Sequence, residues 1–116
     1  MNLTVLAVGD VVAAAGLSFC KAHLPTLREQ VGADFVVVNG ENAANLGIRP
    51  EQAEILLEAG ADAITLGNHT WSRREIIPML EREPRLIRPA NFAPHTPGRG
   101  WAEFDTVAGP VAVVNL

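Results

Sequence analysis

An α/β fold with a mostly parallel sheet is the class that this sequence predicts. Three short apolar segments, at residues 3–8, 34–39 and 62–66, have the length and composition of buried strands. A helical segment follows each of them, and strands that alternate with helices at this spacing are typical of βαβ units. The chain has 116 residues, of which 48% are hydrophobic, so it is long enough for one domain with its own core.

Two helices are expected between these strands. The first covers residues 17–32, where Pro25 predicts a kink or an early break because proline lacks an N–H. The second covers residues 49–60, with Pro50 near its first position and a glycine at its end. Both segments are long enough to pack against the predicted sheet.

A third helix is expected to start at Ser72. Glu75, three positions later, completes the S-x-x-E pattern of a capping box, and Pro78 predicts that this helix is short or bent. The chain from about residue 84 then carries several prolines and little periodicity, which predicts an extended loop up to residue 100.

The last part of the chain predicts an antiparallel hairpin. Its strands are residues 101–107 and 111–116, with a turn at 108–110. The final strand is apolar and has no polar tail, which is unusual for the end of a domain. A last strand of this kind would normally lead into further chain.

Composition and charge exclude several classes of function. The net charge is −4 and no basic stripe occurs, which argues against binding of duplex nucleic acid. The single cysteine, Cys20, fits a reducing compartment. The N-terminus lacks a basic region and Asp10 interrupts its apolar segment, so a signal peptide is not expected. With no apolar stretch of transmembrane length, we expect a cytoplasmic protein without a membrane anchor.

The three predicted strands end in the same way. Each is followed by a glycine and then by polar side chains: Asp10 after the first, Glu41 and Asn42 after the second, Asn68 and His69 after the third. The carboxyl ends of parallel strands meet at one edge of a sheet, which is where ligands bind in open α/β folds. We expect the glycines to let the backbone turn sharply and approach a ligand.

These five side chains form a coherent set for metal chemistry. Asp10 and Glu41 offer carboxylate oxygens for divalent cations, and Asn42 and Asn68 add neutral carbonyl oxygens. His69 is either a further ligand or a general acid. Each cluster alone would be read as a turn, since Asp, Asn and Gly dominate loops. Their recurrence at three successive strand ends favours a shared site.

Three other residues have two interpretations each. Arg88 could contact a phosphate or form a salt bridge, and Trp71 could pack in the core or line the crevice. His95 lies in the proline-rich loop, where either exposure or a substrate contact is consistent with the sequence.

The motifs together resemble a known family. "GDVV", "NGENAA", "GADAITLGNHTW" and "RPANF" with "TPGRGW" are similar to those of the YmdB-like metallophosphoesterases, a branch of the calcineurin-like superfamily. The resemblance implies a metallophosphatase-like α/β sandwich. Residues 1–116 would hold its N-terminal βαβαβα part plus a β-hairpin, with the C-terminal half of the single domain absent.

The resemblance also implies an activity and a set of roles. It implies a phosphodiesterase that hydrolyses 2′,3′-cyclic nucleotides by means of a hydroxide activated by two divalent metals, expected to be iron or manganese. Asp10, Glu41 and Asn42 would bind the first metal. Glu41 would bridge to the second metal, which Asn68 also binds, and His69 would donate a proton to the leaving oxygen.

Two departures from the family pattern leave alternatives open. The family continues its first loop with proline-glycine-arginine, whereas here Ala15 and Leu17 flank Gly16. The family also supplies further histidine ligands from a second half that this sequence lacks. The alternatives are a non-catalytic module that binds nucleotide or metal, and an inactive fragment that self-associates through its last strand into a homo-oligomer.

Overall fold

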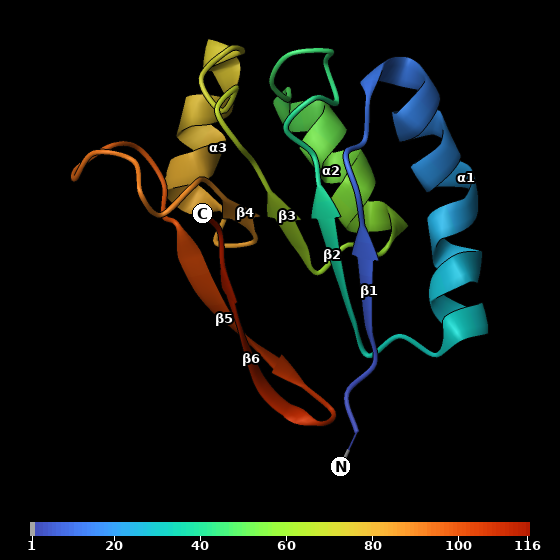
Figure 1. The fold of residues 1–116 in the computed structure, drawn as a ribbon. Helices are drawn as coiled ribbons and strands as arrows, with labels where there is room; N and C mark the ends of the chain where they lie inside the picture. The colour runs from blue at the N-terminus through green and yellow to red at the C-terminus, as the bar shows by residue number, and fades with distance from the viewer. Residues whose placement is uncertain (1) are drawn as a thin grey trace.

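The structure, a computed structural model, describes residues 2–116 as one parallel sheet with helices on one face and a hairpin on the other (Figure 1). The elements of the sheet layer are β1 (Val5–Val8), β2 (Phe35–Asn39), β3 (Ala63–Thr65) and β4 (Leu86–Ile87), and the hairpin is formed by β5 (Trp101–Thr106) and β6 (Gly109–Val114). The helices are α1 (Ala13–Val31), α2 (Pro50–Ala59) and α3 (Ile77–Arg82), with a 3₁₀ turn, η1 (Arg74–Ile76), before α3. The predicted α/β class is confirmed.

The strands of the main sheet are all parallel and lie in the order β1-β2-β3-β4. Val8 pairs with Val38, Asn39 with Thr65, and Thr65 with Ile87. Because this register is nearly level, the carboxyl ends of all four strands reach the same edge of the sheet. That edge carries the loops in which the candidate residues lie.

Two cores hold the layers together. On the helix face, alternate strand residues such as Val36, Val38 and Ile64 pack with buried side chains of the helices. On the opposite face, Phe35 packs against the hairpin, where its ring lies 5.1 Å from that of Phe104 in an edge-on arrangement. The hairpin is thus fixed to the sheet by apolar contacts.

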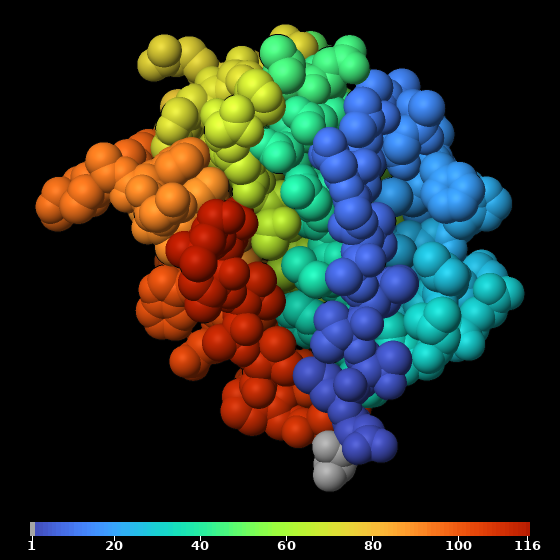
Figure 2. All heavy atoms as spheres, in the orientation of Figure 1, coloured from blue at the N-terminus to red at the C-terminus, as the bar shows by residue number. Residues whose placement is uncertain are grey.

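The first strand is less buried than the sequence predicts. Its residues alternate between exposed and half-buried, and Val5 is 48% exposed. The reason is its position: β1 is an edge strand, and the hairpin covers the sheet beside it but leaves β1 open on that face (Figure 2). The central strand β2, which has neighbours on both sides, is largely buried as expected.

Helix α1 differs from its prediction in two respects. It begins at Ala13 instead of residue 17, and it runs past Pro25 to Val31, so the predicted early break is wrong. Cys20 and Leu24 are buried against the sheet, and this packing outweighs the one hydrogen bond that proline removes. The helix ends at Gly32 in the left-handed conformation.

The segment after β3 is short and irregular. Ser72 caps no helix, so the capping-box prediction is wrong, and Glu75 lies 3.6 Å from Arg49 in an ion pair. The expected short helix is confirmed as α3.

The loop predicted from residue 84 contains β4, two residues that pair with β3. The hairpin is confirmed, with its turn one residue earlier than expected. Among residues 2–116, no helix combines the length and apolarity that a membrane span requires.

Candidate metal site

The structure places the five candidate residues in three neighbouring loops. Asp10 is exposed between β1 and α1. Glu41 and Asn42 follow β2 and are half-buried, and Asn68 and His69 lie in the turn after β3. Because these strands are adjacent in the sheet, the three loops share one edge, as the sequence predicts.

Hydrogen bonds join the first loop to the second. The side-chain Nδ2 of Asn42 donates to Oδ2 of Asp10 at 2.9 Å. The backbone adds two further links, from Val11 N to Asn39 O and from Ala13 N to Asn42 O, each at 3.0 Å. Asp10 is therefore held beside Asn42 although the two are 32 residues apart.

A close contact joins the second loop to the third. The carboxylate of Glu41 lies directly against the Cα of Gly67, so that a Cβ built on Gly67 would be 2.7 Å from Oε1 of Glu41. Gly67 immediately precedes Asn68. The absence of a side chain at position 67 thus allows the Glu41 carboxylate to lie next to Asn68.

The glycines before the clusters serve a purpose different from the one expected. Neither Gly9, Gly40 nor Gly67 has a positive φ, so none is required for a sharp left-handed turn. A Cβ on Gly40 would meet the core at 2.9 Å from Cγ2 of Ile64, and one on Gly67 would overlap Glu41. Gly9 has open space around it. Two of the three glycines are needed for room, one in the core and one at the site.

Two buried oxygens at the site have no hydrogen-bond partner. They are Oε2 of Glu41 and Oδ1 of Asn42, from adjacent residues. A buried acceptor without a donor costs free energy, and natural structures rarely leave one. A cation would satisfy both oxygens, and carboxylate and amide oxygens are ligands that hard divalent ions prefer. The donors present therefore fit a divalent metal.

The donor set is nevertheless incomplete within the described residues. No three His, Cys, Asp or Glu side chains of residues 2–116 gather closely enough to hold a metal ion. Asp10, Glu41 and His69 thus do not converge on one point by themselves, and the asparagine oxygens are essential to any site here. His69 is half-buried in a turn braced by the buried Thr70, whose Oγ1 donates to Gly67 O at 2.6 Å.

A hollow of about 380 Å³ opens beside Glu41 and Asn68. Other walls come from the loop after β4 and from the two residues that follow β6, through Pro89, Asn91, Phe92, Asn115 and Leu116. Asp10, Asn42 and His69 do not line it. Asn91, Phe92 and Asn115 were not among the predicted site residues; the "RPANF" motif is the one local signal that points to the first two.

Arg88 takes a role that neither interpretation had named. It is buried, and its guanidinium donates to three carbonyl oxygens: Pro89 O at 2.9 Å, Pro97 O at 3.0 Å and Gly98 O at 3.4 Å. Among residues 2–116 it pairs with no carboxylate. These hydrogen bonds hold the proline-rich loop against the end of β4, and the guanidinium does not line the hollow.

Trp71 and His95 follow their structural interpretations. Trp71 packs against the core, and its ring lies 5.7 Å from that of Phe92, which links the turn after β3 to the loop after β4. His95 is exposed.

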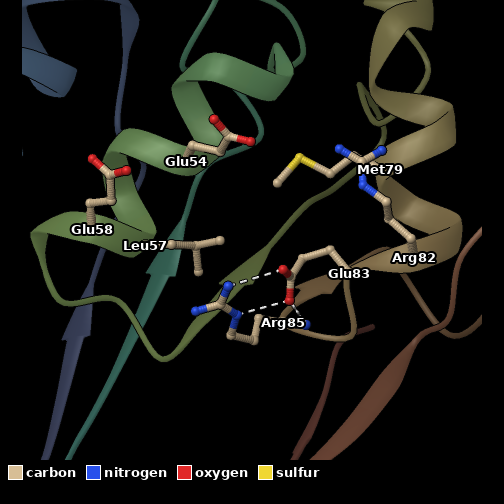
Figure 3. Close-up of a pocket in the computed structure, with 7 residues that line it drawn as sticks. All are labelled: Glu54, Leu57, Glu58, Met79, Arg82, Glu83 and Arg85. Carbon is tan, nitrogen blue, oxygen red and sulfur yellow. Dashed lines mark hydrogen bonds and ion pairs between the residues drawn. The ribbon is translucent and has the colours of Figure 1, made fainter.

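A larger hollow, of about 550 Å³, lies between α2 and α3 on the helix-covered face of the sheet (Figure 3). Leu57 and Met79 contribute apolar surface, and its charged residues are Glu54, Glu58, Arg82, Glu83 and Arg85. Arg85 immediately precedes β4, so this hollow is near the amino ends of the strands.

The charged groups of this larger hollow are already satisfied in part. Hydrogen bonds from Arg85 to the Glu83 carboxylate, at 2.8 and 3.0 Å, hold the pKa of Glu83 below its usual range. None of the buried, unpartnered polar atoms belongs to its lining residues. We therefore assign the candidate site to the smaller hollow.

Comparisons with known proteins identify the family of this chain. The sequence model of the YmdB-like protein family matches residues 6–116. The chain is 40% identical over 115 residues to the 2′,3′-cyclic-nucleotide 2′-phosphodiesterase of Bacillus subtilis (strain 168), and the match covers 98% of this chain and 44% of that protein. The chain therefore spans less than half the length of this relative.

Two solved structures share the fold. One is a hypothetical protein from Thermus thermophilus, with a TM-score of 0.86 and 39% identity over 95% of this chain and 43% of that one. The other is a novel phosphatase from Mycoplasma pneumoniae, with a TM-score of 0.89 and 34% identity over all of this chain and 43% of that one. These matches confirm the metallophosphatase-like α/β fold of residues 2–116.

Proposed function

Because the chain belongs to the YmdB-like protein family, we propose that it is the N-terminal part of a metal-dependent phosphodiesterase that hydrolyses 2′,3′-cyclic nucleotides. The name of the Bacillus subtilis relative supports the substrate class. The observation that carries the metal dependence is the pair of buried, unpartnered oxygens on Glu41 and Asn42, beside the carboxylate of Asp10. The remaining metal donors come from outside residues 1–116.

Each donor has a role in this proposal. Asp10, Glu41 and Asn42 would hold the first of two divalent ions, iron or manganese. Glu41, which lies against Gly67, would also help to hold the second ion, together with Asn68. When bound, such ions would supply positive charge for the phosphate oxygens and a more acidic water at neutral pH.

In the structure the Nδ2 of Asn42 donates to Oδ2 of Asp10, which leaves the Oδ1 of Asn42 without a partner. The hydrogen bond holds Asn42 beside the carboxylate with which it would share the first ion.

His69 acts as the general acid of the proposed reaction. It follows Asn68 directly, in a turn that Thr70 holds in place. An imidazole can release a proton near neutral pH, and it supplies one to the leaving 2′ oxygen of the nucleotide. The hydrolysis then yields a 3′-phosphomonoester.

The test is hydrolysis of 2′,3′-cyclic AMP by the protein at its natural length, with Mn²⁺ added. We expect Asp10→Ala and Glu41→Ala each to lower kcat at least about 100-fold, as removal of a metal ligand should. Asp105→Ala is the matched control, because Asp105 is exposed on the hairpin. Full activity in either ligand variant would refute the site assignment.

One observation favours a second candidate, a binding module without turnover. No three His, Cys, Asp or Glu side chains of residues 2–116 gather into a metal site, so without donors from further chain this part of the protein would bind a nucleotide without turning it over. Calorimetry with 2′,3′-cyclic AMP distinguishes the two. Heat of binding without any product in chromatography would support the module, and product formation would exclude it.

A further inference from the structure

The hydrogen-bond ladder between β3 and β4 stops at a proline. Leu66 N donates to Ile87 O at 2.9 Å. In a parallel ladder, the carbonyl of the same residue accepts its bond from the residue two positions further along the partner strand. That position is Pro89, which has no N–H to donate. The backbone alone would therefore leave Leu66 O unsatisfied.

The side chain of Asn115 takes the place of the missing donor. Its Nδ2 lies 2.6 Å from Leu66 O and 3.2 Å from Ile87 O, and so donates to the last carbonyls of both strands. Leu66 lies 49 residues earlier in the chain. This bond thus ties the end of the hairpin to the end of the sheet.

The backbone of Asn115 is fixed as well. Its N–H donates to Gly100 O at 3.0 Å, and its carbonyl accepts from Ala90 N at 2.7 Å. Gly100 lies so close to Ala90 that a Cβ on Gly100 would overlap it. With both backbone groups bonded, the Asn115 carboxamide has little freedom to leave Leu66.

This junction lies directly beneath the candidate site. Leu66 is followed by Gly67, which abuts the Glu41 carboxylate, and by Asn68. Asn115 also lines the same hollow as Glu41 and Asn68. A shift at the end of β3 would therefore change the position of Asn68 relative to Glu41.

We propose that Asn115 is a positioning residue for the site. Its carboxamide replaces the N–H that Pro89 lacks, and it fixes the end of β3 so that Asn68 and Glu41 face one hollow. The part of the inference that concerns metal rests on the proposed function. The part that concerns the end of β3 does not.

The experiment measures two quantities on the ¹⁵N-labelled protein at its natural length. One is the hydrogen-exchange rate of the Leu66 amide, which reports opening of β3 from β4. The other is the affinity for Mn²⁺. We expect Asn115→Ala to raise the exchange rate about fivefold, the effect of one typical hydrogen bond, and to weaken Mn²⁺ binding about tenfold.

A second substitution makes the test specific. Pro89→Ala restores an N–H at the position where the ladder needs it. In that background, Asn115→Ala should change the Leu66 exchange rate by less than twofold, because the backbone now supplies the donor. Asn115→Asp, which has the same shape but no side-chain N–H, should raise the Leu66 exchange rate at least as much as Asn115→Ala, because the two carbonyl oxygens repel a carboxylate. Gln30→Ala is the control, since Gln30 also carries a carboxamide but is exposed on α1.

Three results would overturn the inference. An unchanged Leu66 exchange rate in Asn115→Ala would show that the hydrogen bond from Asn115 to Leu66 O does not hold β3 against β4. An equal rise for the amides of β1 and β2 means that the whole fold has become less stable and that the role is merely structural. Faster exchange at Leu66 with unchanged Mn²⁺ affinity refutes the positioning role. If the wild-type protein binds no Mn²⁺, the proposed function and the metal part of the inference both fail, while the exchange rates still decide whether Asn115 fixes β3.

Discussion

We expect the substitution Gly67→Ala to weaken metal binding while it leaves the stability of the fold unchanged or slightly raised. The added Cβ would lie 2.5 Å from Cδ and 2.7 Å from Oε1 of Glu41, which is too close for either atom to remain in place. The Glu41 carboxylate is the end of a flexible side chain, so we expect it to move and the backbone of β3 to stay. The substitution would therefore displace the carboxylate that we propose as a metal ligand, without changing Glu41 itself.

The expected energies follow from the same geometry. Oε2 of Glu41 is buried without a partner, and moving it into water recovers part of a cost of about 1–3 kcal/mol. Replacing a glycine whose φ suits alanine adds about 0.4–1 kcal/mol of stability. Crowding from the new methyl group opposes both gains. We expect the free energy of unfolding to be unchanged or raised by about 1 kcal/mol, and the Mn²⁺ affinity to fall at least about 100-fold.

Urea unfolding and Mn²⁺ titration measure the two effects, and two other glycines provide the controls. Gly9→Ala adds a methyl group to open space beside Asp10. The free energy of unfolding and the free energy of Mn²⁺ binding should therefore each change by no more than about 1 kcal/mol. Gly40→Ala adds one 2.9 Å from Cγ2 of Ile64 in the core and should cost about 1–3 kcal/mol of stability. A Gly67→Ala protein that loses more than about 2 kcal/mol and keeps its Mn²⁺ affinity would refute the reasoning.

Three further predictions concern stability. Ala13 has a φ of 56°, which strains an alanine, so Ala13→Gly should raise the free energy of urea unfolding by about 0.5–1 kcal/mol. Oδ2 of Asp62 accepts the Val36 N–H at 2.8 Å, so Asp62→Ala should leave a buried donor unpaired and lower the same quantity by about 1–3 kcal/mol. Hydrogen bonds from Arg85 lower the pKa of Glu83, so this pair stabilises the fold above the ordinary pKa of 4.5 and the contribution is lost as the pH falls through the lower, folded-state value. Glu83→Gln should make thermal unfolding less sensitive to acid in that range.

Matched variants check the first two of these expectations. Ala14→Gly, one residue further into α1, should instead lose about 1 kcal/mol, because glycine destabilises an ordinary helical position. Asp105→Ala should be neutral, since Asp105 is exposed on the hairpin. A stabilising Ala14→Gly, a neutral Asp62→Ala, or an unchanged acid transition in Glu83→Gln would each contradict its prediction.

The features that could be predicted from the sequence are the ones with local causes. An apolar run followed by glycine and polar residues identifies a strand and its carboxyl end within about ten residues of sequence, and this located Asp10, Glu41 and Asn68 at one edge. The helix of residues 50–59 was predicted because proline and glycine mark its two ends. Each of these signals lies inside the element that it predicts.

The features that were missed depend on residues far apart in the chain. The exposure of Val5 results from where the hairpin lies, about 100 residues later, which no local pattern can show. Strand β4 has only two residues, flanked on both sides by a loop rich in proline, so it has no periodicity to detect. The bond from Asn115 to Leu66 and the contact of Gly67 with Glu41 likewise exist only in the folded chain.

The strand order of the sheet has a consequence for how the chain folds during synthesis. Each strand of the order β1-β2-β3-β4 pairs with the strand made immediately before it. The sheet can therefore grow one strand at a time as the chain leaves the ribosome, at about 5–20 residues per second, without waiting for distant segments. Asn115 emerges tens of residues after the loops that carry Asp10, Glu41 and Asn68. The nascent chain can thus assemble the sheet first, and the bond that fixes the end of β3 forms only after all four strands have been made.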